Sequence, residues 1–236
     1  MNLIDVAALV VLIASVVYSL YRGFLHSLLS VACCLLSLLL AFSIAPRLSA
    51  QLWENKSITA EMATYTDART RVQDTTLANM SVSQLNGDES IARVLEKVSL
   101  PSPIAVILEN NLRDRVFASV GLDRVNDYVS NTVVAVAVNV LCFIFAFTVC
   151  FLALSTLVSL IQHVFKLPLL KQLDWLAAVV MGLIRGALIL YVIFLMLPIL
   201  STVIRLDTFD ELVTQSAFAP IFQSNGFFSS VIAGKM

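Results

Sequence analysis

YVSNTVVAVAVNVLCFIFAFTVCFLALSTLVSLIQHVF, residues 128–165, contains no Asp, Glu, Lys or Arg, which indicates that this chain lies in a membrane. A bilayer-spanning helix needs about 20 consecutive apolar residues, whereas a run of about 10–14 is more typical of a buried helix in a soluble protein. Two more uncharged stretches lie at 6–21 and 23–46, and a fourth apolar stretch, 175–204, is interrupted only by Arg185. The sequence therefore predicts an all-α protein with four membrane spans.

The composition agrees with a membrane protein. Apolar residues make up 59% of the 236 residues and charged residues 13%, against about 45–50% and 25% in soluble domains. The net charge of −1 provides no basic surplus, so no nucleic-acid partner is expected. We expect neither a metal nor a cofactor, because the four cysteines lie in apolar stretches without metal-ligand spacing and are typical of packing residues. They are Cys33, Cys34, Cys142 and Cys150.

The first two spans are predicted at about 3–21 and 24–45. The first is expected to be a retained span rather than a signal peptide, because Asp5 is the only charge before Arg22 and no A-x-A cleavage pattern follows. A tight αα-hairpin is the simplest connection, with Gly23 in the turn and Arg22 reaching the headgroups. A single long helix kinked at Gly23 is the competing geometry.

Proline and polar residues limit the other predicted spans. Span two is expected to end at Pro46, which interrupts helical hydrogen bonding. Span three is expected at about 133–161 as one span with polar ends, long enough to tilt or to project beyond the bilayer. Span four is expected from Trp175 to Leu197, where Pro198 follows.

An insert of about 80 residues separates spans two and three and is expected to be helical. Helical spacing of apolar residues appears over 58–76 and 91–98, a third short helix is predicted at 104–112, and Asn86-Gly87 is a turn signal. We expect a helical cap packed on the spans, with a ligand- or partner-binding module as the alternative. The predicted segments are a hairpin at 1–46, the insert at 47–130, spans three and four at 131–200, and a polar, amphipathic tail at 201–236.

Small residues recur on one stripe of several spans, where they let helix backbones approach each other. The predicted packing residues are Ser30, Cys34 and Ser37 in span two and Ala178, Gly182 and Gly186 in span four. A pore lining is the alternative role for the same small and polar faces.

Two residues are candidates for a functional position inside the membrane. The Asn139 amide is expected to seek a partner across a helix interface, a contact of about 0.6–2 kcal/mol. Arg185 lies about 15 Å from the start of span four, near the middle of the bilayer, where a charge is costly unless it snorkels, pairs or faces water. Two roles explain an arginine at this depth: a functional site, or a structural arginine that snorkels to the membrane surface. No acid lies at a matching depth, so backbone carbonyls, Asn139, lipid phosphate and an anionic solute are the candidate partners.

Three segments resemble the colicin V production (CvpA) family of bacterial inner-membrane proteins. They are Ile4-Asp5 with the apolar run into Tyr21-Arg22-Gly23-Phe24, the linker Lys166-Leu167-Pro168 to Asp174, and Met181-Gly182-Leu183-Ile184-Arg185-Gly186. The resemblance implies a bacterial inner-membrane protein linked to peptide toxin (colicin V) production or secretion and to envelope homeostasis, with no established enzymatic activity.

The first functional hypothesis is therefore a non-catalytic scaffold or accessory protein of the bacterial cell membrane. Its expected partners are the lipid bilayer and either further copies of the chain or another membrane protein. The alternative is an oligomeric channel or small-solute transporter with Arg185 and Asn139 at the path. An intramembrane protease is disfavoured, because no span carries paired acids and both histidines, His26 and His163, lie near span ends.

Charges in the short loops predict the orientation. Arg22 lies in the first loop, and Lys166 and Lys171 lie in the third. The excess of Lys and Arg in cytoplasmic loops places both loops in the cytoplasm. The insert and both termini are then expected outside. The reverse orientation is the alternative, because Arg47, Arg113, Arg115 and Arg124 flank the spans on the insert side.

Overall fold

The structure is a computed structural model, and it describes residues 2–66, 68, 72, 74–85, 87–98, 100–164, 174–203 and 215–220. The regular secondary structure of the described residues is helical, apart from one isolated bridge between Ser81 and Arg124. The helices are α1 (Leu3–Arg22), α2 (Phe24–Glu54), α3 (Lys56–Tyr65), α4 (Thr75–Asn79), α5 (Asp88–Val98), α6 (Ser102–Arg113), α7 (Val125–Val164) and α8 (Asp174–Val203), with short 3₁₀ turns at Val82–Gln84 and Ala118–Val120. The predicted all-α class is confirmed.

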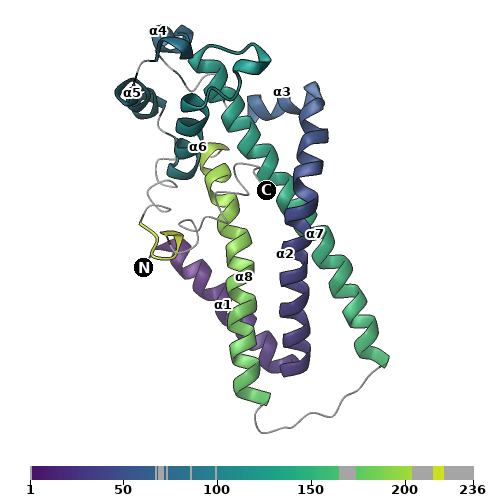
Figure 1. The fold of residues 1–236 in the computed structure, drawn as a ribbon. Helices are drawn as coiled ribbons and strands as arrows, with labels where there is room; N and C mark the ends of the chain where they lie inside the picture. The colour runs from purple at the N-terminus through teal and green to yellow at the C-terminus, as the bar shows by residue number, and fades with distance from the viewer. Residues whose placement is uncertain are drawn as a thin grey trace.

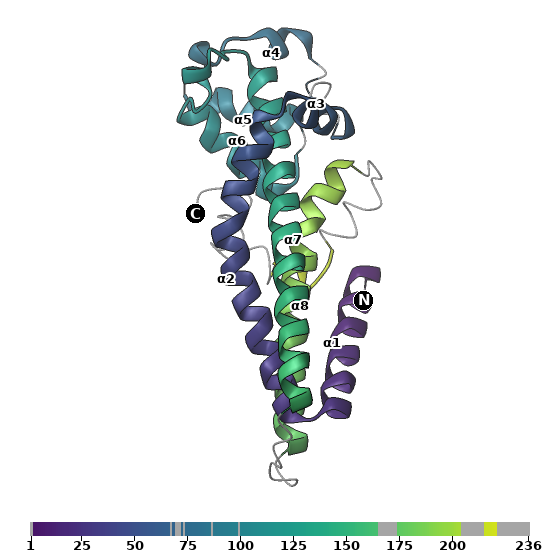
Figure 2. The same ribbon diagram turned by 90° about the vertical axis from the view of Figure 1, so that its right-hand side faces the viewer.

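Four of these helices are long and apolar enough to cross a membrane, as predicted: α1, α2, α7 and α8. Figures 1 and 2 show them running along one bundle, with the shorter helices gathered at one end. Helix α8 packs against both α1 and α2, and α2 also packs along α7. Helix α1 is therefore held mainly by α8, at the edge of the bundle.

Helices α1 and α2 form the predicted hairpin. Gly23 separates them with φ +83°, a backbone conformation that favours glycine. The Ser27 hydroxyl donates to the Gly23 carbonyl at 2.9 Å and lies 3.4 Å from the Ser19 carbonyl across the turn. Both helices run from Gly23 toward the end of the bundle that carries the short helices (Figure 1).

The prediction that the second helix ends at Pro46 is wrong, because α2 continues through Pro46 to Glu54. A proline removes one hydrogen bond and crowds the preceding turn. Membrane helices tolerate this when neighbouring helices support the freed backbone. Helix α2 packs along α7, and Ala41 and Ala45, just before the proline, are fully or almost fully buried in the core shared with that helix.

Helix α7 is a single helix of 40 residues, which confirms one long span rather than two. At 1.5 Å per residue it is about 60 Å long, twice the thickness of a hydrocarbon core of about 30 Å. Its first turns project into the short helices, where Val125, Tyr128 and Val129 are buried. The later turns, including Phe143 and Phe147, pack in the core shared with α2.

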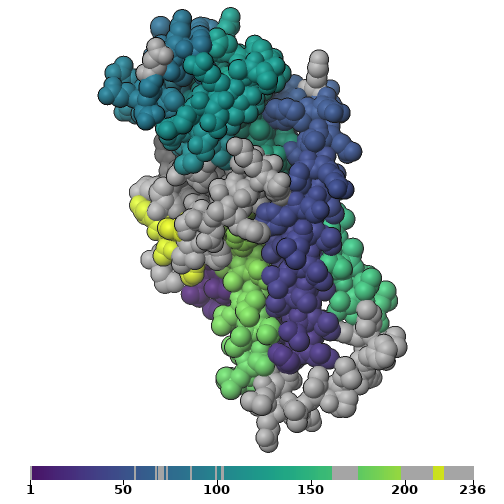
Figure 3. Space-filling view, in the orientation of Figure 1, coloured from purple at the N-terminus to yellow at the C-terminus, as the bar shows by residue number. Residues whose placement is uncertain are grey.

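The short helices form a cap at one end of the bundle (Figure 3). Helices α5 and α6 confirm the predicted helices at 91–98 and 104–112. The predicted continuous spacing over 58–76 is instead divided, because α3 ends at Tyr65 and α4 begins after Asp74. Thr66 caps α3, and its hydroxyl donates to the Met62 carbonyl. Asn86, from the predicted turn, lies outside the described residues. We call the buried residues Val94, Leu108, Val125, Tyr128 and Val129 the cap core.

Residues 215–220 of the tail return to the start of α1. The Asp5 carboxylate accepts hydrogen bonds from the Ser216 hydroxyl at 2.7 Å and from the Ala217 backbone N–H at 3.1 Å. Ala219 is buried with Ala8 and Phe194. The rest of the predicted tail beyond Val203 lies outside the described residues, as do residues 165–173 before α8.

Candidate functional site in the membrane spans

Helix α1 lies close to α8 at the two glycines Gly182 and Gly186. A Cβ atom placed on Gly182 would lie 2.8 Å from the Val16 Cα and 3.0 Å from the Ser19 Cβ. On Gly186 it would lie 2.9 Å from the Leu12 Cδ2. The two glycines are therefore what allow the two backbones to approach, as the small-residue pattern of α8 predicts.

A hydrogen bond between helices accompanies this contact. The Ser15 hydroxyl donates to the Gly182 carbonyl at 2.9 Å, and both residues are buried. The Ser19 hydroxyl, one turn further along α1, is buried without a hydrogen-bond partner. Ser15 and Ser19 were not predicted, although their four-residue spacing in an otherwise apolar helix is the same small-residue signal that identified α8.

The other predicted packing residues lie in or beside the bundle core. Ala178, Cys34 and Ser37 are buried and Ser30 is half-buried. The Ser37 hydroxyl donates to the Cys33 carbonyl of its own helix at 2.6 Å.

Arg185 lies against α1. Its Cζ is 4.6 Å from the centroid of the Tyr18 ring, and the Arg22 Cζ is 5.7 Å from the same centroid. Side chains on a helix lean toward its N-terminus, and α8 begins at the hairpin end of the bundle (Figure 1). The guanidinium therefore lies beside Tyr18, which is one helical turn before Arg22 on α1, although the Arg185 backbone lies about 16 Å into α8.

The polar contacts of Arg185 are few. Its Nε is buried without a hydrogen-bond partner. Within the described residues, the two ion pairs are those of Arg113 with Asp88 and Glu109, and neither involves Arg185 or Arg22. A cation above an aromatic ring gains about 0.5–2 kcal/mol, whereas a buried charged group needs several hydrogen bonds to replace its water. The site therefore holds positive charge that the described residues satisfy only in part.

Asn139 lies in a different part of the bundle. It accepts a hydrogen bond from the Ser49 hydroxyl of α2, which meets the expectation of a partner across a helix interface. Ser49 lies 26 residues beyond Gly23, or about 39 Å along the helix axis, whereas Tyr18 and Arg185 lie near the hairpin turn. The structure does not bring Arg185 and Asn139 together.

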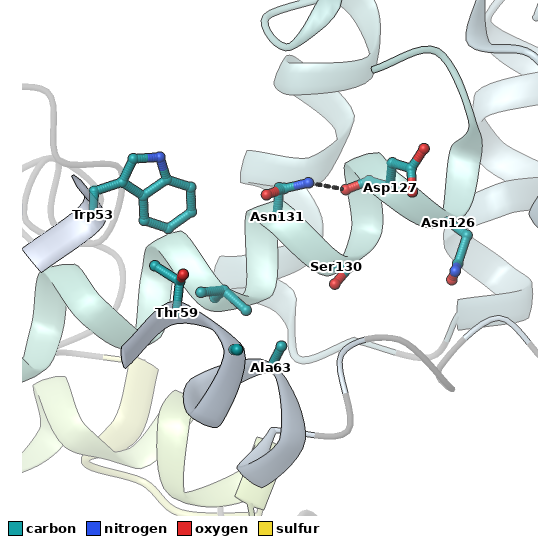
Figure 4. A pocket seen from close by; sticks show the side chains of 9 residues that line it. Trp53, Thr59, Ala63, Asn126, Asp127, Ser130 and Asn131 are labelled. Carbon is teal, nitrogen blue, oxygen red and sulfur yellow. Dashed lines mark hydrogen bonds between the residues drawn. The ribbon is translucent and has the colours of Figure 1, made fainter. Parts of the chain in front are cut away.

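A cavity of about 490 Å³ lies where α2, α3 and α7 meet below the cap (Figure 4). Its lining residues are Trp53, Thr59, Ala60, Ala63, Asn126, Asp127, Ser130, Asn131 and Val134. The Asn131 amide donates to the Asp127 carbonyl at 2.8 Å, and the Asn126 Oδ1 is buried without a partner. The cavity is polar on its α7 side, and no pattern in the sequence indicates it.

The helices and their arrangement define a multi-pass membrane protein with a helical cap. Within the described residues, no group of three or more His, Cys, Asp or Glu side chains is placed to hold a metal ion.

The family model described as Colicin V production protein matches residues 4–78 and 115–226. The chain therefore belongs to this family. The match includes all four membrane helices and both sides of the α1–α8 contact, and it leaves out residues 79–114 of the cap. No curated protein and no solved structure matches the chain.

Proposed function

We propose that this protein is a non-catalytic scaffold or accessory subunit of the bacterial cytoplasmic membrane, which assists peptide toxin production or export and envelope maintenance. Membership of the Colicin V production family supports the biological setting. The observation that carries the scaffold role is the use of the polar side chains in the spans. Ser15 bonds to α8, Ser49 bonds to Asn139 of α7, and Ser37 bonds within α2.

The bonds of Ser15 and Ser49 join helices, and the bond of Ser37 satisfies its hydroxyl within α2, so these polar groups support packing rather than line a path. The outward faces of the spans are apolar. Val10, Ile13 and Val17 are more than half exposed on α1, as are Phe145 and Leu152 on α7. Such faces contact lipid or the helices of a membrane partner, and this is the surface that a scaffold requires.

Affinity purification from native membranes tests the proposal. The tagged protein, extracted in a mild detergent, should co-purify with a membrane partner or as a defined oligomer. A substitution on the outward face of α7, Phe145→Gln, should weaken that association. Ser83→Gln, on the exposed surface of the cap, is the matched control and should leave it unchanged. A clean monomer without a membrane partner would contradict the scaffold role.

The partly satisfied charge of Arg185 supports a second candidate function, an oligomeric channel or small-solute transporter. Four spans are few for a transporter, so this function requires several copies of the chain. Liposomes containing the protein should then pass anions or small solutes, and Arg185→Ala should reduce the flux. If neither the wild type nor Arg185→Ala passes anions or small solutes, the channel function is contradicted.

The proposed orientation places the α1–α2 hairpin and the α7–α8 linker in the cytoplasm, with the cap outside. Lys166, Lys171 and Arg22 in these two short connections support it. A cysteine at exposed Ser83, introduced into a chain without native cysteines, should react with a membrane-impermeant maleimide added to intact cells whose outer surface is accessible. Labelling only after the membrane is opened would reverse the orientation.

A further inference from the structure

An apolar groove lies along the outward face of α1. It has a volume of about 560 Å³ and is lined by Val10, Ile13, Ala14, Val17, Tyr18 and Tyr21. These residues follow the i, i+3, i+4 spacing of one helix face, and Leu12, Ser15, Val16 and Ser19, which meet the α8 glycines, lie on another. The groove is thus separate from the contact that holds α1 on α8.

The hairpin end of this groove is positively charged. Tyr18 lines the groove, and the same ring contacts the guanidinium groups of both Arg185 and Arg22. The sequence has no Asp or Glu from Val6 to Trp53, and no described acid pairs with either arginine. The buried Nε of Arg185 also remains without a hydrogen-bond acceptor.

We propose that this groove binds one anionic phospholipid. Its acyl chain lies along Val10, Ala14 and Val17, and its phosphate lies between the guanidinium groups of Arg22 and Arg185, beside the Tyr18 ring. Guanidinium donors match phosphate oxygens in geometry and charge, so the phosphate supplies the acceptors that Arg185 lacks. The apolar groove and the cationic end meet at Tyr18, so a single molecule with an apolar chain and an anionic head fits both.

Native mass spectrometry of the delipidated, full-length protein tests this site. The probes are phosphatidylglycerol and phosphatidylethanolamine of matched chain length, added in equal amounts. The wild type should bind one phosphatidylglycerol in preference to phosphatidylethanolamine. Each basic residue near a membrane surface contributes about 1 kcal/mol, so Arg185→Gln and Arg22→Gln should each reduce the bound anionic lipid about fivefold.

Matched variants separate the parts of the site. Ala14→Trp should fill the groove and also reduce lipid binding, and it should leave the fold intact because Ala14 is exposed. Arg47→Gln removes an exposed arginine at the other end of α2 and should have no effect. Arg22 is exposed at the turn, so Arg22→Gln keeps the test valid if Arg185→Gln fails to fold.

Any one of four results would overturn the proposal. The first is equal binding of the two lipids by the wild type. The second is unchanged phosphatidylglycerol binding in Arg22→Gln and Ala14→Trp. The third is full displacement of the lipid by glycerol 3-phosphate at the same concentration, which would indicate a site for a soluble anion rather than for a lipid. A dimer that forms through α1 and excludes lipid would assign the groove to a second copy of the chain instead.

Discussion

The cap core and the α1–α8 interface show two ways of packing helices within one chain. The cap core is built from large side chains, and Val94, Leu108, Val125 and Val129 have no exposed surface. The α1–α8 interface is built around glycine and serine, and a Cβ on Gly182 would lie only 2.8 Å from the Val16 Cα of α1. Water drives large apolar side chains together in the cap. Lipid provides no such drive, so the membrane helices depend on close contact and hydrogen bonds.

This difference explains why α7 changes character along its length. Its first turns contribute Val125, Tyr128 and Val129 to the cap core, whereas its later turns pack Phe143 and Phe147 against the spans. Helix α7 therefore joins the cap, which the hydrophobic effect stabilises, to the membrane bundle, which close helix packing and hydrogen bonds stabilise. Substitutions in the two regions should therefore lower the free energy of unfolding by different amounts.

The largest effect is expected in the cap core. Leu108→Ala removes a fully buried side chain and should lower the free energy of unfolding of the cap by about 3 kcal/mol, since the lost burial and the cavity both contribute. Urea denaturation in detergent, followed by protease sensitivity of the cap, measures it. Val106→Ala, at an exposed position of the same helix, is the control. Equal losses for the two variants would show that water does not drive packing here.

The next effect is expected at the glycines of α8, and the two should differ. Gly182→Ala places a Cβ 2.8 Å from a backbone atom, Val16 Cα, whereas Gly186→Ala meets the flexible end of Leu12 at 2.9 Å. Overpacking costs about 1–3 kcal/mol, so Gly182→Ala should lose about 2 kcal/mol and Gly186→Ala less. Unfolding in mixed SDS micelles measures the difference. A larger loss of stability in Gly186→Ala than in Gly182→Ala would contradict the closer backbone approach at Gly182.

A smaller effect is expected for the hydrogen bond between α1 and α8. Ser15→Ala removes the donor to the Gly182 carbonyl and should cost about 0.6 kcal/mol, a typical value for such bonds in membranes. Ser19→Ala is the matched control, because its buried hydroxyl has no partner, and it should be neutral or slightly stabilising. A larger loss in Ser19→Ala than in Ser15→Ala would contradict this assignment.

The smallest effect is expected at Asp74, at the surface of the cap. Hydrogen bonds from the Leu77 and Thr76 backbone N–H groups hold the pKa of this carboxyl below its ordinary value. A lowered pKa means that the contribution is present above the unfolded value and is lost as pH falls through the folded value. Cap stability should therefore fall slightly below about pH 4, and Asp74→Asn should flatten this part of the profile. An unchanged profile in Asp74→Asn would assign the pH dependence to another group.

Local patterns in the sequence were sufficient for much of the fold. Three charge-free runs and one apolar stretch interrupted only by Arg185 identified the four spans, and Gly23 identified the hairpin, because these signals depend on neighbouring residues alone. The small-residue spacing of α8 identified Gly182 and Gly186, although it did not indicate that α1 is their partner.

Local sequence patterns did not predict the contacts between residues that are distant in the chain. Helix α2 continues through Pro46 because it packs along α7, and the residues next to Pro46 in the sequence do not indicate this packing. The same limit applies to Arg185, whose partner Tyr18 comes from another helix, and to Asp5, whose partners lie more than 200 residues away. The position of the Arg185 charge near the hairpin end also depends on the direction in which α8 runs past α1.

Disulfide cross-linking tests whether α1 contacts the glycines of α8 as described. A Cβ on Gly186 would lie 3.2 Å from the Ser15 Cβ, a few tenths of an ångström below the usual range of about 3.5–4.5 Å for a disulfide. In a chain without the four native cysteines, Ser15→Cys with Gly186→Cys should cross-link rapidly on mild oxidation in native membranes. Ala14→Cys with Gly186→Cys, which places the first cysteine on the outward face of α1, should not. Cross-linking of the Ala14 pair but not of the Ser15 pair would contradict the α1–α8 contact.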